Sequence, residues 1–298
     1  MSVNIPALFA ESFSTNVQML LQQKGSKMRG SVAEGSYVGN QASVVDQIGA
    51  VEAQQVTSRF GPMGRIDAAV DRRWVFPTDF DLPQLIDTFD KLRLIINPES
   101  NYVMNAVQAL GRKIDKVILD AFTGTAKTGL NGGTSTVVLA ANEVDVAVGG
   151  SNSRLNVAKL KAVKEIMMAN FIDFDNDPVY VGITAKDHSA LLDEIQIISS
   201  DFNGGDRPVL KDGKVTGFLG FQFIHCELIE SLMAGTNEVN IPVWAKSGMH
   251  LGVWNDISAS TSVRNDLQSE PFQAYVKGTF GATRVEEKKV YNIESYRA

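Results

Sequence analysis

The sequence predicts an α+β protein, and three observations lead to that fold class. A long amphipathic helix is expected over residues 98–122, a helix, a strand and a second helix follow one another within residues 155–230, and alternating strands fill the chain after Asn240. Within residues 155–230 no side chains of the types that cooperate in catalysis come together. We therefore expect the function to reside in surface and assembly.

Length and composition set the limits within which the chain must fold. A chain of 298 residues with 44% hydrophobic residues can bury one or two cores. No apolar run reaches the roughly 18 residues that a membrane span needs, and the N-terminus lacks the basic and then apolar layout of a secretory signal. The sequence thus predicts a soluble protein of a cytoplasm, with no membrane partner.

The charge and the cysteine count exclude further classes. A formal net charge of -6 argues against a dedicated nucleic-acid binder, although it leaves room for a protein that encloses nucleic acid without gripping it. Cys226 is the only cysteine in the sequence, so neither an intrachain disulfide nor a cysteine-based zinc site is available. We interpret Cys226 as a small core residue on a strand.

The first element is an amphipathic helix that begins after Pro6 and stops before residues 24–30. Its apolar side chains recur at helical spacing and are Leu8, Phe9, Phe13, Val17, Leu20 and Leu21. A helix with such a face must dock on another surface.

Residues 28–74 differ in character from the rest of the chain. Glycines separate short alternating pieces such as residues 36–38 and 66–70, and large apolar residues are few. We interpret the segment as a two-armed excursion whose buried face lies against a neighbouring subunit. Its arginines are either solvated charges or partners in ion pairs between subunits, and they are Arg29, Arg59, Arg65, Arg72 and Arg73.

The helix expected over residues 98–122 has the clearest signals. Asn97 is suited to cap it, Pro98 to occupy its first turn, and Gly124 to end it. At 1.5 Å per residue it would be roughly 37 Å long, enough to act as a spine across a flat domain. A coiled coil is the alternative, but the apolar pattern does not continue.

The middle of the chain reads as helix, strand, helix and strand. Leu160, Val163 and Met167 share a helical face, and residues 179–183 alternate as a strand does. Thr184 with Asp187 starts a short second helix whose apolar residues are Leu191, Leu192 and Ile195. After a polar loop at residues 199–213, residues 218–224 are expected to form one buried strand.

The end of the chain is predicted to be strands. Alternating apolar residues mark strands near residues 241–243, 249–253 and 257–263, and two more are expected over residues 272–280 and 283–293.

No catalytic, cofactor or metal site is predicted. Residues 124–129 superficially resemble a phosphate loop, but Ala126 stands before Lys127 where such a loop has glycine, so we interpret them as a plain loop. The three histidines are too scattered for a metal site. The acidic run at residues 173–177 lacks the glycine of a calcium loop, since Pro178 takes the sixth position.

The order of these elements resembles the major capsid proteins of tailed phages, whose fold is shared with encapsulin shells. Residues 178–192 are similar to the family's axial strand and short helix, and residues 217–223 to its following strand. Residues 253–264 and 272–287 look like its closing strands. Under this resemblance the parts are an N-terminal arm (1–27), an extended β-hairpin loop (28–90), a peripheral domain (91–150) with the spine helix 98–122, an axial domain (151–246) and returning peripheral strands (247–298).

The resemblance implies a structural protein that is not an enzyme. It would self-assemble through hexamers and pentamers into an icosahedral head that encloses double-stranded DNA without binding it specifically. The implied partners are other copies, a portal protein, a decoration protein and a separate scaffolding protein, the last because the chain begins close to the arm. Assembly would take place in the host cytoplasm and the product would be the virion. An encapsulin-like compartment and a soluble α/β enzyme are the alternatives.

The resemblance also implies which residues take part in assembly. They are Phe9, Phe13 and Val17 on the arm, Arg65, Arg72 and Arg73 on the loop, and Phe202, Asn203, Gly204, Gly205 and Asp206 at the axial tip. Some members of the family cross-link through a lysine in the extended loop, but no lysine lies between Lys27 and Lys91, so that route is not expected here.

Overall fold

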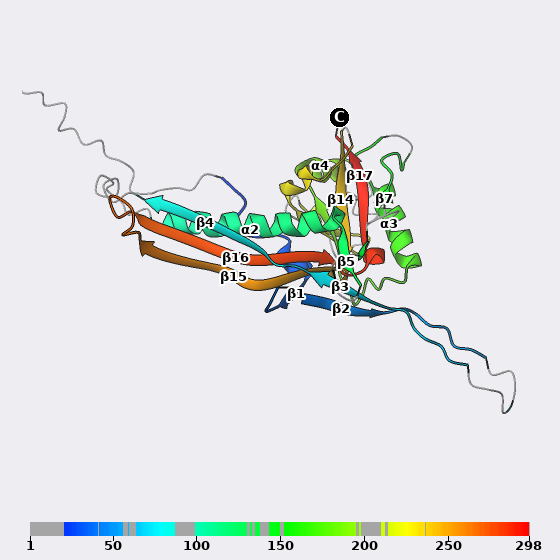
Figure 1. The fold of residues 1–298 in the computed structure, drawn as a ribbon. Helices are drawn as coiled ribbons and strands as arrows, with labels where there is room; N and C mark the ends of the chain where they lie inside the picture. Colours follow the sequence, from blue (N-terminus) through cyan, green and yellow to red (C-terminus); the bar gives the residue numbers. More distant parts are fainter. Residues whose placement is uncertain are drawn as a thin grey trace, which may run out of the picture.

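The computed structural model describes residues 21–40, 42–55, 59, 64–86, 99–129, 132, 135–137, 143–149, 152–194, 197, 210–211, 214–235 and 237–297. Within them a long, flat unit extends to one side of a more compact unit, and a β-hairpin projects on the opposite side (Figure 1). We call the flat unit the peripheral unit and the compact one the axial unit.

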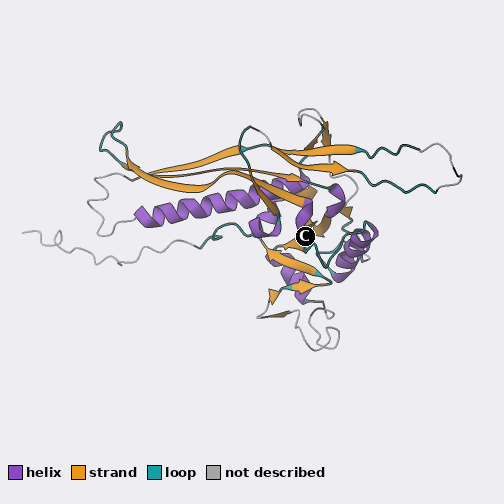
Figure 2. Ribbon diagram, turned by 90° about the horizontal axis from the view of Figure 1, so that it is seen from below, coloured by secondary structure: helices purple, strands orange, loops and turns teal. Residues whose placement is uncertain are grey.

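The peripheral unit is a four-stranded sheet covered by one long helix. The strand order is β1-β15-β16-β4, with β1 (Ala33–Ser36) parallel to β15 (Met249–Val263), and with β16 (Phe272–Arg284) antiparallel to both β15 and β4 (Thr78–Ile86). Helix α2 (Glu99–Thr123) lies along one face of this sheet (Figure 2). Val276 of β16 packs against Ala106 and Leu110 of α2. Among the described residues no helix covers the opposite face of this sheet, which we call the open face.

Helix α2 confirms the helix predicted over residues 98–122. Its buried residues recur three or four positions apart and are Ala106, Leu110, Ile114, Ile118, Leu119 and Phe122. The helix ends where the Gly124 N–H donates to the Asp120 carbonyl at 2.9 Å. Beyond it, the buried Arg284 donates to the carbonyls of Phe122 and Gly124, which satisfies groups that a helix end leaves without intrahelical partners.

The axial unit is a seven-stranded sheet with two shorter helices. The strand order is β11-β12-β8-β14-β17-β7, and β13 also pairs with β14. The strands are β7 (Glu143–Val144), β8 (Val179–Ile183), β11 (Gly217–Phe218), β12 (Phe221–His225), β13 (Met233–Gly235), β14 (Glu238–Ala245) and β17 (Val290–Tyr296). The helices are α3 (Val157–Ala169) and α4 (Ala185–Leu192). As predicted, the Thr184 side chain caps α4 by accepting from the Asp187 N–H.

Two strand predictions in this unit were wrong. Residues 218–224 do not form one strand, because a tight turn at Leu219 (φ 55°) and Gly220 (φ 86°) folds β11 back onto β12. The pattern hid this turn, since leucine rarely adopts a positive φ. Strand β17 does not return to the peripheral sheet with β15 and β16; it pairs with β14 in the axial sheet.

The β-hairpin has its own small sheet at its root. Strands β2 (Ala42–Ile48) and β3 (Val70–Val75) are antiparallel, and β3 also pairs with β5 (Ala126–Thr128), which pairs with β6 (Ser135–Val137). The two arms continue to residues 55 and 64, side by side in Figure 1. We call residues 42–55 and 64–75 the ribbon. The excursion is shorter than residues 28–90, because Met28 and Val32 join a core and β4 joins the peripheral sheet.

The expected loop at residues 124–129 also proved to contain a strand, β5. The remaining elements are short: η2 (Arg29–Ser31), η3 (Glu227–Ser231), η4 (Lys246–Gly248), η5 (Glu287–Lys289), β9 (Leu210–Lys211) and β10 (Lys214–Val215). Two large apolar clusters hold the described residues together. One lies around β8 and α3 in the axial unit, and the other joins α2 to β14 and β15 where the two units meet. Cys226 is buried in the second cluster, directly after β12.

Candidate assembly surfaces

The segment before β1 is held to α2 by one buried carboxylate. Asp115, fully buried, accepts hydrogen bonds from the backbone N–H of Lys27 (3.1 and 3.0 Å) and of Met28 (3.1 Å), and from the side chains of Gln23 (2.5 Å) and Ser26. A glycine at position 111 permits the close approach. A Cβ there would lie 2.7 Å from the backbone of Gly25.

Followed backward from Met28 to Gln22, this segment lies along α2 toward the helix's N-terminal end. Arg112 donates to the side chain of Gln22 (2.8 Å) and to the carbonyl of Gln23 (3.0 Å), and Gln22 donates to Asn105 (2.9 Å). Only six residues of α2 precede Asn105, so at 1.5 Å per residue about 9 Å of the helix is left beyond this point. Phe9, Phe13 and Val17 lie outside the described residues. The anchoring contacts hold residues 22–28 along α2, from Asp115 back to Asn105.

Arg73 fixes the root of the ribbon to its own chain. Its side chain is 5% exposed, and it donates to the Val285 carbonyl at 2.9 Å and to the Glu287 carboxylate at 2.6 Å. Asp71 lies 3.4 Å from the same guanidinium. Arg73 was expected to contact a neighbour, and within this chain its guanidinium is paired with Glu287, Val285 and Asp71.

The other two arginines expected at the interface also have partners within the ribbon. Arg72 donates to Asp46 at 2.5 and 3.1 Å and lies over the Trp74 ring. Arg65 lies 2.7 Å from Asp67, and both side chains are largely exposed. Exposed pairs of this kind contribute little to stability. Both arginines thus remain accessible for contact with another molecule.

The ribbon carries an apolar stripe that its own chain does not cover. Ile48 and Val70 are paired across the two strands and are 74% and 72% exposed. Continuing the same register places Ala50, Ala68 and Ile66 on the same face, because side chains alternate along each arm. A two-stranded ribbon has no second layer, so it cannot bury these side chains itself.

A second exposed apolar site lies on the axial unit, at the end of α3. Phe171 is 95% exposed and has a φ of 61°, although the position after a helix that requires a positive φ usually holds glycine. The backbone N–H of Phe171 and of Ile172 donate to Met168 and Met167, as they do in a Schellman motif. The sequence did not indicate this site, because phenylalanine gives no sign of a left-handed backbone conformation. The expected axial tip, residues 202–206, lies outside the described residues.

The buried charges of the axial unit serve its structure. Asp187 is fully buried and accepts from Arg297 at 2.6 and 2.8 Å, from Ser295 and from Thr184. Burial by itself would raise the pKa of Asp187, but the guanidinium of Arg297 outweighs it and holds that pKa below its usual range. This network ties the end of β17 to the start of α4.

Lys159 is the second buried charge. Its ammonium donates to the carbonyls of Ser153 (2.6 Å) and Glu294 (2.8 Å). Burial lowers its pKa to about 8, because the interior disfavours the charged form. These two hydrogen bonds join α3 to the segment before it and to β17, so Lys159 stabilises the axial unit.

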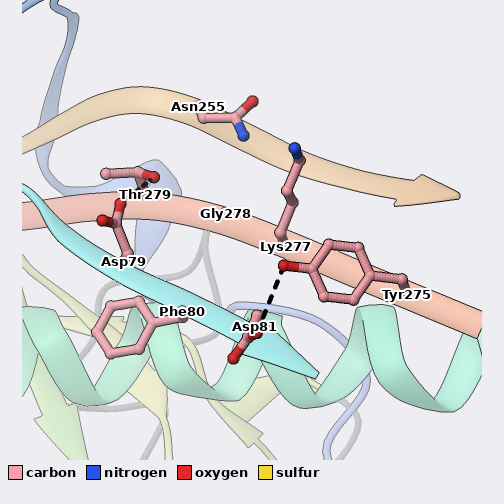
Figure 3. Close-up of a pocket in the computed structure, with 8 residues that line it drawn as sticks. All are labelled: Asp79, Phe80, Asp81, Asn255, Tyr275, Lys277, Gly278 and Thr279. Atoms are coloured by element: carbon pink, nitrogen blue, oxygen red, sulfur yellow. Dashed lines mark hydrogen bonds between the residues drawn. The ribbon is translucent and has the colours of Figure 1, made fainter. Parts of the chain in front are cut away.

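One groove of the described surface lies on the peripheral sheet and is lined by polar side chains that pair with one another. The groove in Figure 3, of about 490 Å³, is lined by residues of β4, β15 and β16, where Thr279 donates to Asp79 at 2.6 Å and Tyr275 to Asp81 at 3.4 Å. In both pairs a hydroxyl donates to an exposed carboxylate of β4. Among the described residues no three His, Cys, Asp or Glu side chains gather as metal ligands would. No helix in the same residues is long and apolar enough to cross a membrane.

The architecture is that of virus capsid proteins. The structure is similar to the capsid protein of cyanophage P-SCSP1u, with a TM-score of 0.75 and 12% identity over 100% of this chain and 95% of that one. It is similar to the cyanophage Pam1 capsid protein, with a TM-score of 0.75 and 11% identity over 98% and 97% of the two chains. A third similar structure, from Mycobacterium phage Che8, has a TM-score of 0.64 and 16% identity over 95% and 96%. At these identities the likeness establishes the fold.

The sequence establishes the family. Residues 5–296 match the family model for the phage capsid protein, so the chain belongs to the phage capsid protein family. A search of curated protein sequences found no match. The resemblance stated from the sequence is confirmed: the chain is a structural major capsid protein with the tailed-phage capsid fold, and its place is the capsid of the virion. The encapsulin-like compartment and the soluble enzyme are not favoured.

Proposed function

We propose that copies of this chain assemble through rings of six and five into a closed icosahedral head around double-stranded DNA. The observation that carries this proposal is the ribbon, whose exposed apolar stripe projects from a root fixed by Arg73. An apolar stripe on a rigid projection is suited to lie on a second copy. Each contact is weak, but contacts that close into rings and overlap sum over a lattice.

The arm supplies a second contact between copies. Its expected amphipathic helix needs an apolar surface, and the segment that follows it is anchored to α2 by Asp115 and Arg112. Under this proposal Phe9, Phe13 and Val17 dock on a neighbour, Arg65 and Arg72 contact it from the ribbon, and residues 202–206 meet at the centre of each ring.

The chain is divided into four parts that take different positions in the head, and other proteins complete it. The parts are the arm (1–27), the extended loop (28–90), the peripheral domain (91–150 and 247–298) and the axial domain (151–246), with β17 added to the axial sheet. A separate scaffolding protein, a portal protein and a decoration protein complete the head, which assembles in the host cytoplasm. The role is structural and needs no cofactor.

The experiment combines size-exclusion chromatography and negative-stain microscopy of the purified chain, alone and with a candidate scaffolding protein. Closed shells, tubes or rings are expected, and Val70→Asp should prevent them while leaving the unfolding transition unchanged, because Val70 is exposed in the single chain. Val51→Asp is the matched control, since it adds the same charge to the opposite face of the ribbon. A chain that stays monomeric under all conditions contradicts the proposal.

A further inference from the structure

The two faces of the peripheral unit carry different charges. On the α2 face, four exposed lysines lie within two turns of the helix and the adjacent segment: Lys24, Lys27, Lys113 and Lys116. The hydrogen bonds of Asp115 place residues 24–27 beside this part of α2. We call these four residues the lysine stripe.

Few acids oppose the lysine stripe. Between residues 102 and 123, α2 contains two, of which Asp115 is buried and engaged by backbone N–H groups. The other, Asp120, is exposed. Glu227 lies near Lys27, whose ammonium donates to the carbonyl of His225. The stripe is thus a basic surface on a chain whose formal net charge is -6.

The open face of the sheet has the opposite character. Asp79 and Asp81 are exposed there, and their bonds to Thr279 and Tyr275 place them on the side away from α2. Strands β4, β15 and β16 contain one lysine, Lys277, which points away from the helix in Figure 3. Arg29, the residue after Met28, is paired with Glu34 and Asp256.

A flat subunit in a closed wall has one face inside and one outside. A basic face favours phosphates, and an acidic face repels them. We infer that the lysine stripe lines the interior of the shell and contacts the phosphate backbone of the enclosed DNA, while the open sheet face lies outside; this inference rests on the proposed function.

The expected contact is independent of base sequence. Lysine ammonium groups on an exposed helix face bind phosphates as point charges and release counterions from the DNA. Contacts to the phosphate backbone carry no base information, so the contact agrees with a DNA that is enclosed without specific binding. The lysine stripe is thus a local positive charge on one face of a chain whose formal net charge is negative.

The first test measures binding of a fluorescent 30-base-pair duplex to the unassembled full chain over a range of salt concentrations. The triple variant Lys24→Gln, Lys113→Gln and Lys116→Gln should reduce the slope of log K against log salt by about 2–3, at roughly 0.9 for each phosphate contact. Lys27 is left unchanged because it also bonds His225. Lys277→Gln is the matched control and should leave the slope unchanged. An unchanged slope in the triple variant, or no binding of the original chain at low salt, would overturn the contact.

The second test asks which face lies inside. Cys226, the chain's only cysteine, is fully buried, so a cysteine added at the surface can be labelled selectively. In assembled shells a maleimide on a large polymer should label Lys277→Cys and leave Lys116→Cys unlabelled until the shells are opened. The reverse pattern overturns the inference. If no shells form, the proposed function fails, and the duplex experiment on the unassembled chain still decides whether the stripe binds phosphates.

Discussion

Replacing Asp115 by alanine is expected to release residues 23–28 from the middle of α2. The change removes the acceptor for two backbone N–H groups and for the side chains of Gln23 and Ser26. The bond from Met28 is buried, and a buried N–H without a partner costs about 1–3 kcal/mol. The other bonds are partly exposed, so water replaces them at about 0.5–1 kcal/mol in total. The free energy of unfolding should therefore fall by about 1.5–4 kcal/mol.

The assay for this prediction is urea unfolding of the unassembled chain, combined with hydrogen exchange at Lys27 and Met28. Both amides should exchange faster in Asp115→Ala, because they lose their acceptor. Asp120→Ala is the control, since Asp120 lies on the same helix but is exposed, and it should change stability by less than about 0.5 kcal/mol. Equal losses in the two variants, with unchanged exchange at Met28, would refute the view that this carboxylate anchors the arm.

Three further outcomes can be checked on the same unassembled chain. Gly111→Ala should destabilise it, although alanine favours helices by about 1 kcal/mol, because the new Cβ would meet the backbone of Gly25; a higher melting temperature contradicts this. Phe171→Gly should leave the free energy of unfolding unchanged or raise it by up to about 1 kcal/mol, because glycine adopts a positive φ without strain. The control Met168→Gly, inside α3, should lower the free energy of unfolding by about 1 kcal/mol. Burial lowers the pKa of Lys159 to about 8 from 10.5, so between these values the unfolded chain binds a proton that the folded chain releases, and stability rises with pH. The rise, on the order of 3 kcal/mol at most, should be absent from Lys159→Met, and parallel pH profiles would disprove it.

Local signals in the sequence predicted local structure well. The period of apolar residues predicted α2 to within one residue at each end, and Thr184 was recognised as the cap of α4. Both depend on contacts within a few turns of one helix. The order of such elements was sufficient to suggest the capsid fold.

Features that depend on distant partners could not be predicted. Arg73 was expected to contact a neighbour. Its intrachain partner, Glu287, is 214 residues away in the chain, so no residue near Arg73 in the sequence indicates this ion pair. A lone aspartate on a helix usually faces solvent, so Asp115 gave no signal that it holds the arm. The turn at Leu219 was missed for a different reason: surrounding structure imposes a conformation that the residue itself disfavours.

Strand β4 is the last strand in the order of the peripheral sheet, and Pro83 lies in its middle, opposite Tyr275. Proline has no N–H, so it is tolerated in a strand only where that position faces away from the neighbouring strand. The outward side of β4 therefore lacks a donor at its centre, and a strand from another molecule cannot form a continuous ladder with it. Pro83 thus disfavours the pairing of two copies edge to edge along β4.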